Sequence, residues 1–211
     1  MSTTYSPQQM LAAIAFASRV LEERKEEVNR LNVFPVPDGD TGTNMSLTIK
    51  SVVDNIQSLP ADAPNADVLK AIITGALMGA RGNSGVITSQ ILRGFCEGTV
   101  GHTTLDAEVL NKAFAKAEEV AFQAVRKPVE GTILTVLRDS AAAAAQAHAD
   151  HLTVEDALEA IVAEAYASVQ RTPDFLPVLK ENGVVDAGGF GLAILLDAFS
   201  ASLTAARRRW R

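Results

Sequence analysis

Cysteine, aromatic residues and a surplus of basic charge are what this sequence has least of. The single cysteine, Cys96, cannot form an internal disulfide, so we expect a reducing compartment such as the cytoplasm. Aromatic residues make up 5% of the chain while alanine is abundant, which favours closely packed helices over a β-sandwich. The net charge of −6 argues against a general nucleic-acid binder, which would carry a basic surplus, so no nucleic-acid partner is expected.

Two kinds of targeting segment are also missing from the sequence. The first residues, Met1 to Ser6, show no basic region followed by an apolar core, so no signal peptide is predicted. No apolar run approaches the length of a membrane span, and no transmembrane segment is expected. With 47% hydrophobic and 21% charged residues, the chain of 211 residues resembles an ordinary soluble protein and can bury one full core, so we predict a single domain.

Apolar residues recur at helical spacing in eight segments that are separated by glycine, proline or polar turns. The predicted helices cover residues 7–31, 43–59, 67–78, 86–97, 104–125, 133–148, 153–171 and 192–208, with one short turn within 174–180. No segment alternates apolar and polar residues with β-branched enrichment, so no sheet is expected. The connections are mostly short, which predicts an all-α fold: an antiparallel up-and-down barrel or bundle of eight helices.

The starts of these helices differ in kind. The odd-numbered helices open with plain polar caps, which are Ser6, Asp67, Thr104 and Thr153. The even-numbered helices open with glycine-rich sequences, which are Gly42-Thr-Asn, Gly82-Asn-Ser-Gly, Gly131-Thr and Asp186-Ala-Gly-Gly. In an up-and-down arrangement all even-numbered starts lie at one end of the domain. Glycine there lets a ligand approach the backbone and frees N–H groups to bind it.

The stretch from Asn32 to Asn44 precedes the second helix and carries two carboxylates, Asp38 and Asp40, with one glycine between them. Such a pair can converge on Mg²⁺, which typically takes one or two carboxylates together with substrate phosphates. A helix N-terminus beside the pair attracts an anion. Pro-Asp-Gly alone is more typical of a simple turn capped by Thr41 or Thr43. Because the glycine-rich starts recur on the same rim, we predict a site for a polyphosphate with bound Mg²⁺.

Four stretches carry a resemblance to a known family. They are Asn-Val-Phe-Pro-Val-Pro-Asp-Gly-Asp-Thr-Gly-Thr-Asn-Met (residues 32–45), Gly-Ala-Arg-Gly-Asn-Ser-Gly (79–85), Glu-Gly-Thr-Ile (130–133) and Leu-Lys-Glu-Asn-Gly-Val-Val-Asp-Ala-Gly-Gly (179–189). Together they resemble the nucleotide-binding domain of dihydroxyacetone kinase of the L-subunit type. They are still more similar to the amino-terminal domain of the bacterial fatty acid kinase ATP-binding subunit. The resemblance covers nearly the whole chain, in order.

This resemblance implies an eight-helix barrel with ADP or ATP and two Mg²⁺ ions at one end. It also implies a kinase that phosphorylates a fatty acid carboxylate, held by a separate fatty-acid-binding protein, to give an acyl phosphate. Fatty acid kinase subunits resemble this chain only at their start, so residues 1–211 are expected to be the excised amino-terminal domain of a longer chain. Activity is then expected to need the missing domains and the partner, and the resemblance allows a homodimer of the full-length protein.

Carried over position by position, the resemblance assigns a role to twelve residues. Asp38 and Asp40 become the catalytic residues and the Mg²⁺ ligands. The dihydroxyacetone kinases have a third aspartate where this chain has Val33, so Asn32 is the candidate for the third oxygen ligand. The predicted nucleotide-binding residues are Thr41, Thr43 and Asn44 from the second helix, Gly82, Asn83 and Ser84 from the fourth, Gly131 and Thr132 beside the ribose or base, and Asp186 from the last loop.

Two alternatives to a fatty acid kinase stay open. One is the L-type subunit of a dihydroxyacetone kinase, in which a partner would have to supply a base for the hydroxyl acceptor. The other is a non-catalytic ADP-binding regulatory module, which the loss of Asp38 or Asp40 would indicate, although both are present. A carboxylate acceptor is ionised at neutral pH and needs no general base, which agrees with the absence of histidine from the four motifs.

Overall fold

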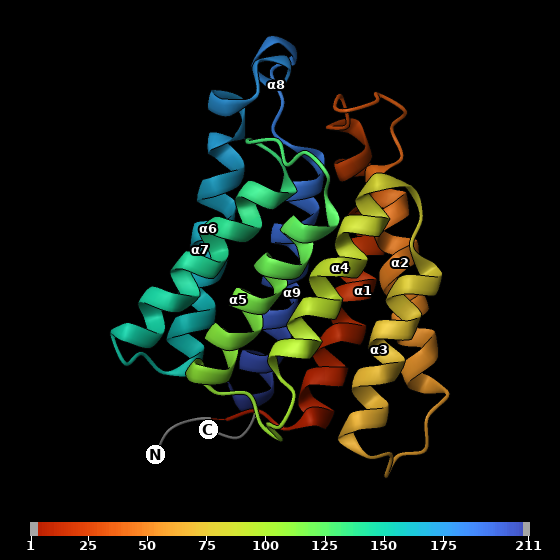
Figure 1. The fold of residues 1–211 in the computed structure, drawn as a ribbon, viewed down its shortest axis with the longest axis vertical. Coiled ribbons are helices and arrows are strands. Elements are labelled where there is room, and N and C mark those ends of the chain that lie inside the picture. Colours follow the sequence, from red (N-terminus) through yellow and green to blue (C-terminus); the bar gives the residue numbers. More distant parts are fainter. Residues whose placement is uncertain (1–3, 209–211) are drawn as a thin grey trace.

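The helical periodicity of the sequence becomes nine α-helices within residues 4–208, the part of the chain that the computed structural model describes. Side chains are described as far as residue 205. The helices are α1 (Pro7–Arg30), α2 (Thr41–Gln57), α3 (Asn65–Gly79), α4 (Gly82–Gly98), α5 (Ala107–Ala124), α6 (Ile133–Ala149), α7 (Val154–Phe175), α8 (Pro177–Asn182) and α9 (Ala187–Arg208). Eight of them are long and run up and down, while α8 is short and lies at one end (Figure 1).

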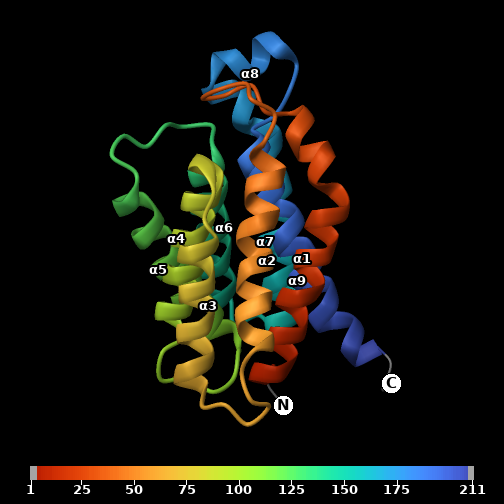
Figure 2. The same ribbon diagram turned by 90° about the vertical axis from the view of Figure 1, so that its right-hand side faces the viewer.

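The eight long helices close into a ring. Each long helix contacts the next one along the chain, and α9 contacts both α7 and α1, so that the last helix packs beside the first (Figures 1 and 2). No strand occurs in the part of the chain that the structure describes; Tyr5 and Leu105 form a single isolated bridge. The predicted all-α up-and-down barrel is confirmed.

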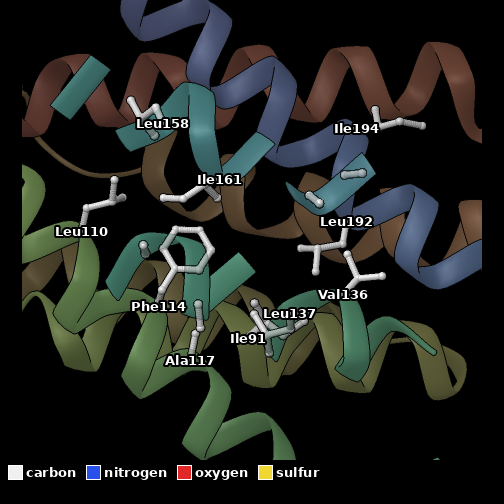
Figure 3. Packing of buried hydrophobic residues seen from close by; sticks show 14 of the residues in the cluster. Ile91, Leu110, Phe114, Ala117, Val136, Leu137, Leu158, Ile161, Leu192 and Ile194 are labelled. Carbon is white, nitrogen blue, oxygen red and sulfur yellow. The ribbon is translucent and has the colours of Figure 1, made fainter. Parts of the chain in front are cut away.

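The inner faces of the helices form one apolar core. Figure 3 shows side chains from α4, α5, α6, α7 and α9 meeting inside the ring, and they include Ile91, Phe114, Leu137, Ile161 and Leu192. Removing such side chains from water is the main stabilising contribution to a fold of this kind. In the half of the barrel opposite the start of α2, the interior keeps an apolar cavity of about 150 Å³ between α1, α3, α4 and α9.

Small residues let α4 and α5 approach closely. A Cβ atom added to Gly94 would lie 2.6 Å from the Cα of Ala117, and one added to Gly98 would lie 2.6 Å from the Cα of Ala113. The two glycines are four residues apart and therefore share one face of α4. Cys96 is buried on the same helix, and burial raises the pKa of its thiol to about 12, in keeping with a structural role.

The predicted end of the seventh helix near Arg171 is wrong, because α7 continues through Pro173 to Phe175. Proline has no N–H to donate to the carbonyl four residues earlier, which belongs to Val169. The hydroxyl of Thr172 donates to that carbonyl at 2.7 Å instead. A side chain therefore replaces the missing backbone bond and lets the helix pass the proline.

The predicted start of the last helix at Leu192 is also wrong, because α9 begins at Ala187 and includes three glycines in its first turns. These glycines are there for close packing. A Cβ atom on Gly189 would lie 2.8 Å from Val136 Cγ2, and one on Gly191 would lie 2.7 Å from Met45 Sδ.

The expectation that no apolar run is long enough to span a membrane is also wrong for α9, since Ala187–Ala205 is long enough and has a mean hydropathy of 1.4. That stretch is 61% buried inside the protein, as in the core helix of a globular domain.

Two of the predicted caps are confirmed and two are wrong. The hydroxyls of Ser6 and Thr153 cap α1 and α7. The residue that caps α5 is Asp106 rather than Thr104, and α3 follows Pro64 with no side-chain cap rather than beginning at Asp67. The second helix begins at Thr41, two residues earlier than predicted.

Candidate functional site

The starts of α2, α4, α6 and α9 lie together at one end of the barrel, which we call the rim (Figure 1). A cavity of about 460 Å³ opens there, and we call it the rim cavity. Two loops border it: the loop of residues 31–40 before α2, and the loop of residues 125–132 before α6. Figure 2 shows these loops on different sides of the same end of the barrel, with the second extending away from α5. The up-and-down topology thus brings together segments far apart in the sequence.

Ten of the twelve site residues predicted from the sequence line the rim cavity. They are Asn32, Asp38, Asp40, Thr41, Asn44, Gly82, Asn83, Ser84, Thr132 and Asp186. The other two, Thr43 and Gly131, are not on its lining. The structure therefore places most of the predicted residues in one place, while their roles in binding or catalysis stay predictions.

Asp38 and Asp40 project from a short stiff loop. Asp38 is exposed and Asp40 is half-buried, and Gly39 between them has a φ of +68°, which favours glycine. The backbone carbonyl of Asp40 accepts the hydrogen bond of Asn44 N at 2.8 Å, while its carboxylate does not cap α2. No hydrogen bond or ion pair within the described residues engages either carboxylate, and within those residues no group of three or more Asp, Glu, His or Cys side chains is arranged to hold a metal. Both carboxylates are thus without a side-chain or backbone partner within the described residues.

Two asparagines at the end of α1 hold the first turn of α2. Asn32 is buried; its Oδ1 accepts hydrogen bonds from both the N–H, at 3.2 Å, and the hydroxyl of Thr41, and its Nδ2 donates to Val36 O at 2.6 Å. Asn29 Oδ1 accepts from Thr43 N at 3.1 Å, while Asn29 Nδ2 donates to Thr43 Oγ1 at 3.0 Å. Thr43 thus faces α1. Asn29, which was not predicted from the sequence, lies in the last turn of α1, three residues before Asn32.

The first turn of α4 is open to the cavity. Arg81 precedes the helix without a side-chain cap, and Gly82 adopts a φ of +59°. This φ favours glycine, and a Cβ atom at Gly82 would also lie 2.4 Å from Asn44 Nδ2. The N–H groups of Gly82, Asn83 and Ser84 form no hydrogen bond within the described residues, and the helix ladder begins with Gly85 N donating to Arg81 O at 3.0 Å. Free N–H groups at a helix start are suited to bind an anion.

Asp186 joins the starts of α6 and α9 at the floor of the cavity. Its Oδ2 accepts from Gly189 N at 2.7 Å, and its own N–H donates to Thr172 Oγ1 at 3.0 Å. Burial raises the pKa of the Asp186 carboxyl to about 6, while hydrogen bonds from the backbone of Gly189 and Ile133 act in the opposite direction. Asp186 therefore has a structural capping role.

Gly131 forms the turn that leads into α6. It has a φ of +81°, and a Cβ atom there would lie 2.7 Å from Thr172 O. Its N–H donates to Thr135 Oγ1 at 2.9 Å, and the hydroxyl of Thr132 donates to Val129 O at 2.8 Å. These bonds shape the end of the 125–132 loop, so Gly131 affects the cavity through the backbone.

Several residues that line the rim cavity were not predicted from the sequence. Arg126 and Lys127 are basic, and an apolar portion of the lining includes Phe34, Val86 and Val129. The basic pair had one local signal, since it precedes Pro128 in a connection between two helices. The apolar residues had none, because isolated apolar residues in loops and first turns fit no helical face.

Comparison with known proteins gives the family. The family model for the DAK2 domain matches residues 35–201. The chain belongs to the DAK2 domain family. The domain is of the dihydroxyacetone kinase L-subunit-like type, so the resemblance noted in the sequence is confirmed at this level. The match includes both carboxylates and every helix start on the rim.

Curated relatives of this DAK2 domain are longer proteins. Protein YloV of Bacillus subtilis (strain 168) is 45% identical over 183 residues, and a protein of Staphylococcus haemolyticus (strain JCSC1435) is 45% identical over 184 residues. Each match covers 87% of this chain and 33% of the relative. The chain thus spans about a third of the length of these curated relatives.

Solved structures share the fold. The dihydroxyacetone kinase of C. freundii in complex with AMP-PNP and Mg²⁺ superposes with a TM-score of 0.68 and 19% sequence identity, covering 96% of this chain and 35% of that one. The native form of the same kinase gives a TM-score of 0.64 over 94% of this chain. At this identity the likeness establishes the helical barrel.

Proposed function

We propose that this DAK2 domain binds ATP with Mg²⁺ and transfers the terminal phosphoryl group to a fatty acid carboxylate held by a separate fatty-acid-binding protein. The observation that carries the proposal is the pairing of two unengaged carboxylates, Asp38 and Asp40, with the free N–H groups at the start of α4 in one cavity. Carboxylate oxygens suit Mg²⁺, and helix-start N–H groups suit phosphate. The residues present therefore fit a magnesium nucleotide.

Each part of the rim has a proposed task. Asp38 and Asp40 hold Mg²⁺ against the phosphates, the first turn of α4 with Gly82, Asn83 and Ser84 receives phosphate oxygens, and the apolar portion of the lining is available to the base. Asn44 and Thr132, which line the same cavity, are proposed as further polar contacts of the nucleotide. When bound, Mg²⁺ supplies charge neutralisation for phosphoryl transfer, and the protein supplies positioning.

The proposed ligand set for the metal differs from the sequence prediction at Asn32. The Oδ1 atom of Asn32 already accepts two hydrogen bonds from Thr41, so we propose that Asn32 positions the loop. Phosphate and water oxygens would then provide the rest of the coordination, as is usual for Mg²⁺. The second Mg²⁺ ion of the sequence prediction would have to bind mainly through such oxygens.

The choice of a carboxylate acceptor is supported by the side chains around the cavity. No histidine lines the rim cavity within the described residues, and His102 lines the apolar cavity in the other half of the barrel. A carboxylate is ionised at neutral pH and needs no base, whereas a hydroxyl acceptor would benefit from one. The likeness to dihydroxyacetone kinase supports the alternative, an L-type subunit acting on dihydroxyacetone with a base from its partner. We place either activity in the cytoplasm, which agrees with the free buried Cys96.

Calorimetric titration of ADP and ATP, with and without Mg²⁺, tests the nucleotide site directly. The wild type is expected to bind both in a Mg²⁺-dependent manner, and the double variant Asp38→Ala/Asp40→Ala is expected to lose that dependence. Asp62→Ala, an exposed aspartate in the connection between α2 and α3, is the matched control. Tight binding that ignores both the metal and the double substitution would contradict the site.

The acceptor is tested separately, with the full-length protein. Long-chain fatty acid is supplied on a fatty-acid-binding protein, and acyl phosphate is trapped as a hydroxamate. Dihydroxyacetone supplied with a dihydroxyacetone-binding partner subunit is the competing assay. Product in the second assay alone would replace the carboxylate acceptor with the hydroxyl one, and nucleotide binding without turnover in either assay would favour a regulatory module.

A further inference from the structure

Two basic side chains of the rim cavity have no partner. Arg126 and Lys127 lie in the 125–132 loop, line the cavity and are exposed. Neither forms an ion pair or a hydrogen bond with any other described residue. They are the only lysine or arginine side chains on the described lining of this cavity.

Many basic residues on the outer surface behave differently. Lys25, Lys50, Lys112 and Lys116 each lie within 3 Å of a carboxylate on the same helix. Such exposed pairs contribute little to stability, but in each of them a carboxylate neutralises the positive charge of the lysine. The cavity loop instead presents two adjacent positive charges with no acidic side chain bound to either.

The base of the 125–132 loop is held firmly although its tip is exposed. Glu130 accepts from Arg138 Nη1 at 2.6 Å and from Thr135 Oγ1 at 2.9 Å. The same Thr135 oxygen accepts from Gly131 N at 2.9 Å. Arg138 and Thr135 belong to α6, so the helix fixes the α6 end of the loop that carries Arg126 and Lys127. A preformed loop loses less conformational freedom when a ligand binds.

Charges of opposite sign are kept apart on the cavity wall. The carboxylates of Asp38 and Asp40 come from the 31–40 loop, and the cations of Arg126 and Lys127 come from the 125–132 loop, which borders the cavity elsewhere (Figure 2). No ion pair joins the two sets within the described residues. A ligand that carries a metal cation beside a group of anionic oxygens would match both loops at once.

We propose that Arg126 and Lys127 bind the terminal phosphate of the nucleotide and the anionic acceptor, so that the site is built for a carboxylate rather than a neutral hydroxyl. This inference rests on the proposed function. In the transfer, a carboxylate oxygen bonds to the terminal phosphorus, the bond to the bridging oxygen breaks, and ADP leaves with that electron pair, so no proton has to be removed. Two anions must approach each other in this step, and two fixed cations lower the repulsion between them.

The test compares affinities for the magnesium complexes of ATP and ADP by calorimetric titration. In Arg126→Gln/Lys127→Gln, MgATP binding is expected to weaken about tenfold or more, because hydrogen bonds to charged groups are lost, while MgADP binding changes by less than about threefold. The dependence of MgATP affinity on salt concentration should also become shallower in the variant. Lys70→Gln removes an exposed charge on α3 away from the cavity and should leave both affinities unchanged. Arg126→Lys/Lys127→Arg keeps both charges and should retain most of the preference for MgATP.

The outcomes separate this inference from the proposed function. An unchanged ratio of MgATP to MgADP affinity in Arg126→Gln/Lys127→Gln would overturn the role of the pair, even with the Mg²⁺ site intact. Failure of the wild type to bind either magnesium nucleotide would instead overturn the proposed function. Both side chains are exposed, so the melting temperature of the variant should match that of the wild type and confirm that folding is preserved.

Discussion

The two ends of the barrel start their helices in different ways. At the end opposite the rim, side chains of the N-cap residues serve three of the four helix starts: Ser6 accepts from Gln9 N at 3.3 Å, Asp106 from Val109 N at 2.8 Å and Thr153 from Asp156 N at 3.2 Å. The fourth, α3, follows Pro64 and has no side-chain cap. At the rim, the residues before α2, α4 and α6 provide no such bond. The first end follows the usual rule for a stable helix start, and the rim departs from it.

Side chains from other parts of the chain bind the first turns of three of the four rim helices, so only one rim helix lacks a side-chain cap. Asn29 and Asn32 of the α1 end serve the first turn of α2, and Asp186 bonds to the starts of both α6 and α9. Among the four helices that start at the rim, α4 is the one whose first-turn N–H groups have no side-chain partner within the described residues. A helix start without a cap is less stable, but its free N–H groups can bind an anion. Departures from the usual capping preferences are expected at functional sites.

The largest effect is expected from closing the space between α1 and α2 at the rim. A Cβ atom on Gly42 would lie 2.2 Å from Lys25 O, so Gly42→Ala should lower the free energy of unfolding by about 3 kcal/mol through overpacking against backbone. Gly101, in the connection at the opposite end, has a φ of +85° and nothing within 4 Å of its added Cβ. Gly101→Asn should therefore cost less than about 1 kcal/mol, since asparagine tolerates this conformation. Urea unfolding of both variants measures the contrast, and equal losses would contradict it.

The second effect is a dependence of stability on pH, which comes from the buried carboxyl group of Asp186 at the rim. Burial raises the pKa of Asp186 to about 6 from an ordinary value of 3.8, so the folded protein holds this proton more tightly than the unfolded chain does. The resulting stabilisation is present below about pH 4 and is lost as the pH rises through about 6. Relative to wild type, Asp186→Asn should therefore gain up to about 3 kcal/mol of stability between pH 4 and pH 7.

Unfolding measured across this pH range in wild type and Asp186→Asn checks the prediction. Asp106→Asn, the matched change at the cap of α5, reports what the loss of an aspartate cap does where water reaches the side chain. A stability difference between Asp186→Asn and wild type that stays constant with pH would show that the Asp186 carboxyl titrates alike in the folded and unfolded chains.

The third effect concerns the asparagine that we assign to positioning. Asn32→Ala removes the acceptor of Thr41 and the donor to Val36 O, so we expect a loss of about 2 kcal/mol in unfolding free energy together with weaker MgATP binding. Asn182→Ala on exposed α8 removes a single bond to Val178 O and should cost less than about 1 kcal/mol. Unchanged stability with lost Mg²⁺ dependence would mean that Asn32 is a metal ligand after all.

Much of this comparison could be predicted from the sequence. The period of the apolar residues located all eight long helices, and their alternation along the chain placed the glycine-rich starts at one end. The carboxylate pair Asp38 and Asp40 and the turn at Gly82 carried their own local signals, namely a Pro-Asp-Gly-Asp loop and glycine before a helix. These features depend on residues adjacent in sequence, which is why pattern reading found them.

The features that the sequence did not reveal depend on contacts between distant segments. The helix passes Pro173 because a neighbouring threonine hydroxyl replaces one bond, and glycines at 188, 189 and 191 continue α9 because other helices press against them. The bonds from Asn29 and Asn32 to α2, and the place of Arg126 in the cavity, arise only when α1, α2 and the 125–132 loop have met. Local preference rules cannot supply such information.

The smallest effects are expected from removing one hydroxyl group from a helix start at each end of the barrel. Thr153→Ala removes a plain cap and should cost about 1 kcal/mol of stability with no change in MgADP affinity. Ser84→Ala at the start of α4 loses only a long bond of 3.4 Å to Thr41 O, so stability should change by less than about 0.5 kcal/mol while MgADP binding weakens severalfold. Unfolding and calorimetric titration of both variants give four values. If Ser84→Ala destabilised the fold as a cap does and left nucleotide affinity unchanged, the α4 start would be an ordinary helix start, and the difference between the two ends would have no functional meaning.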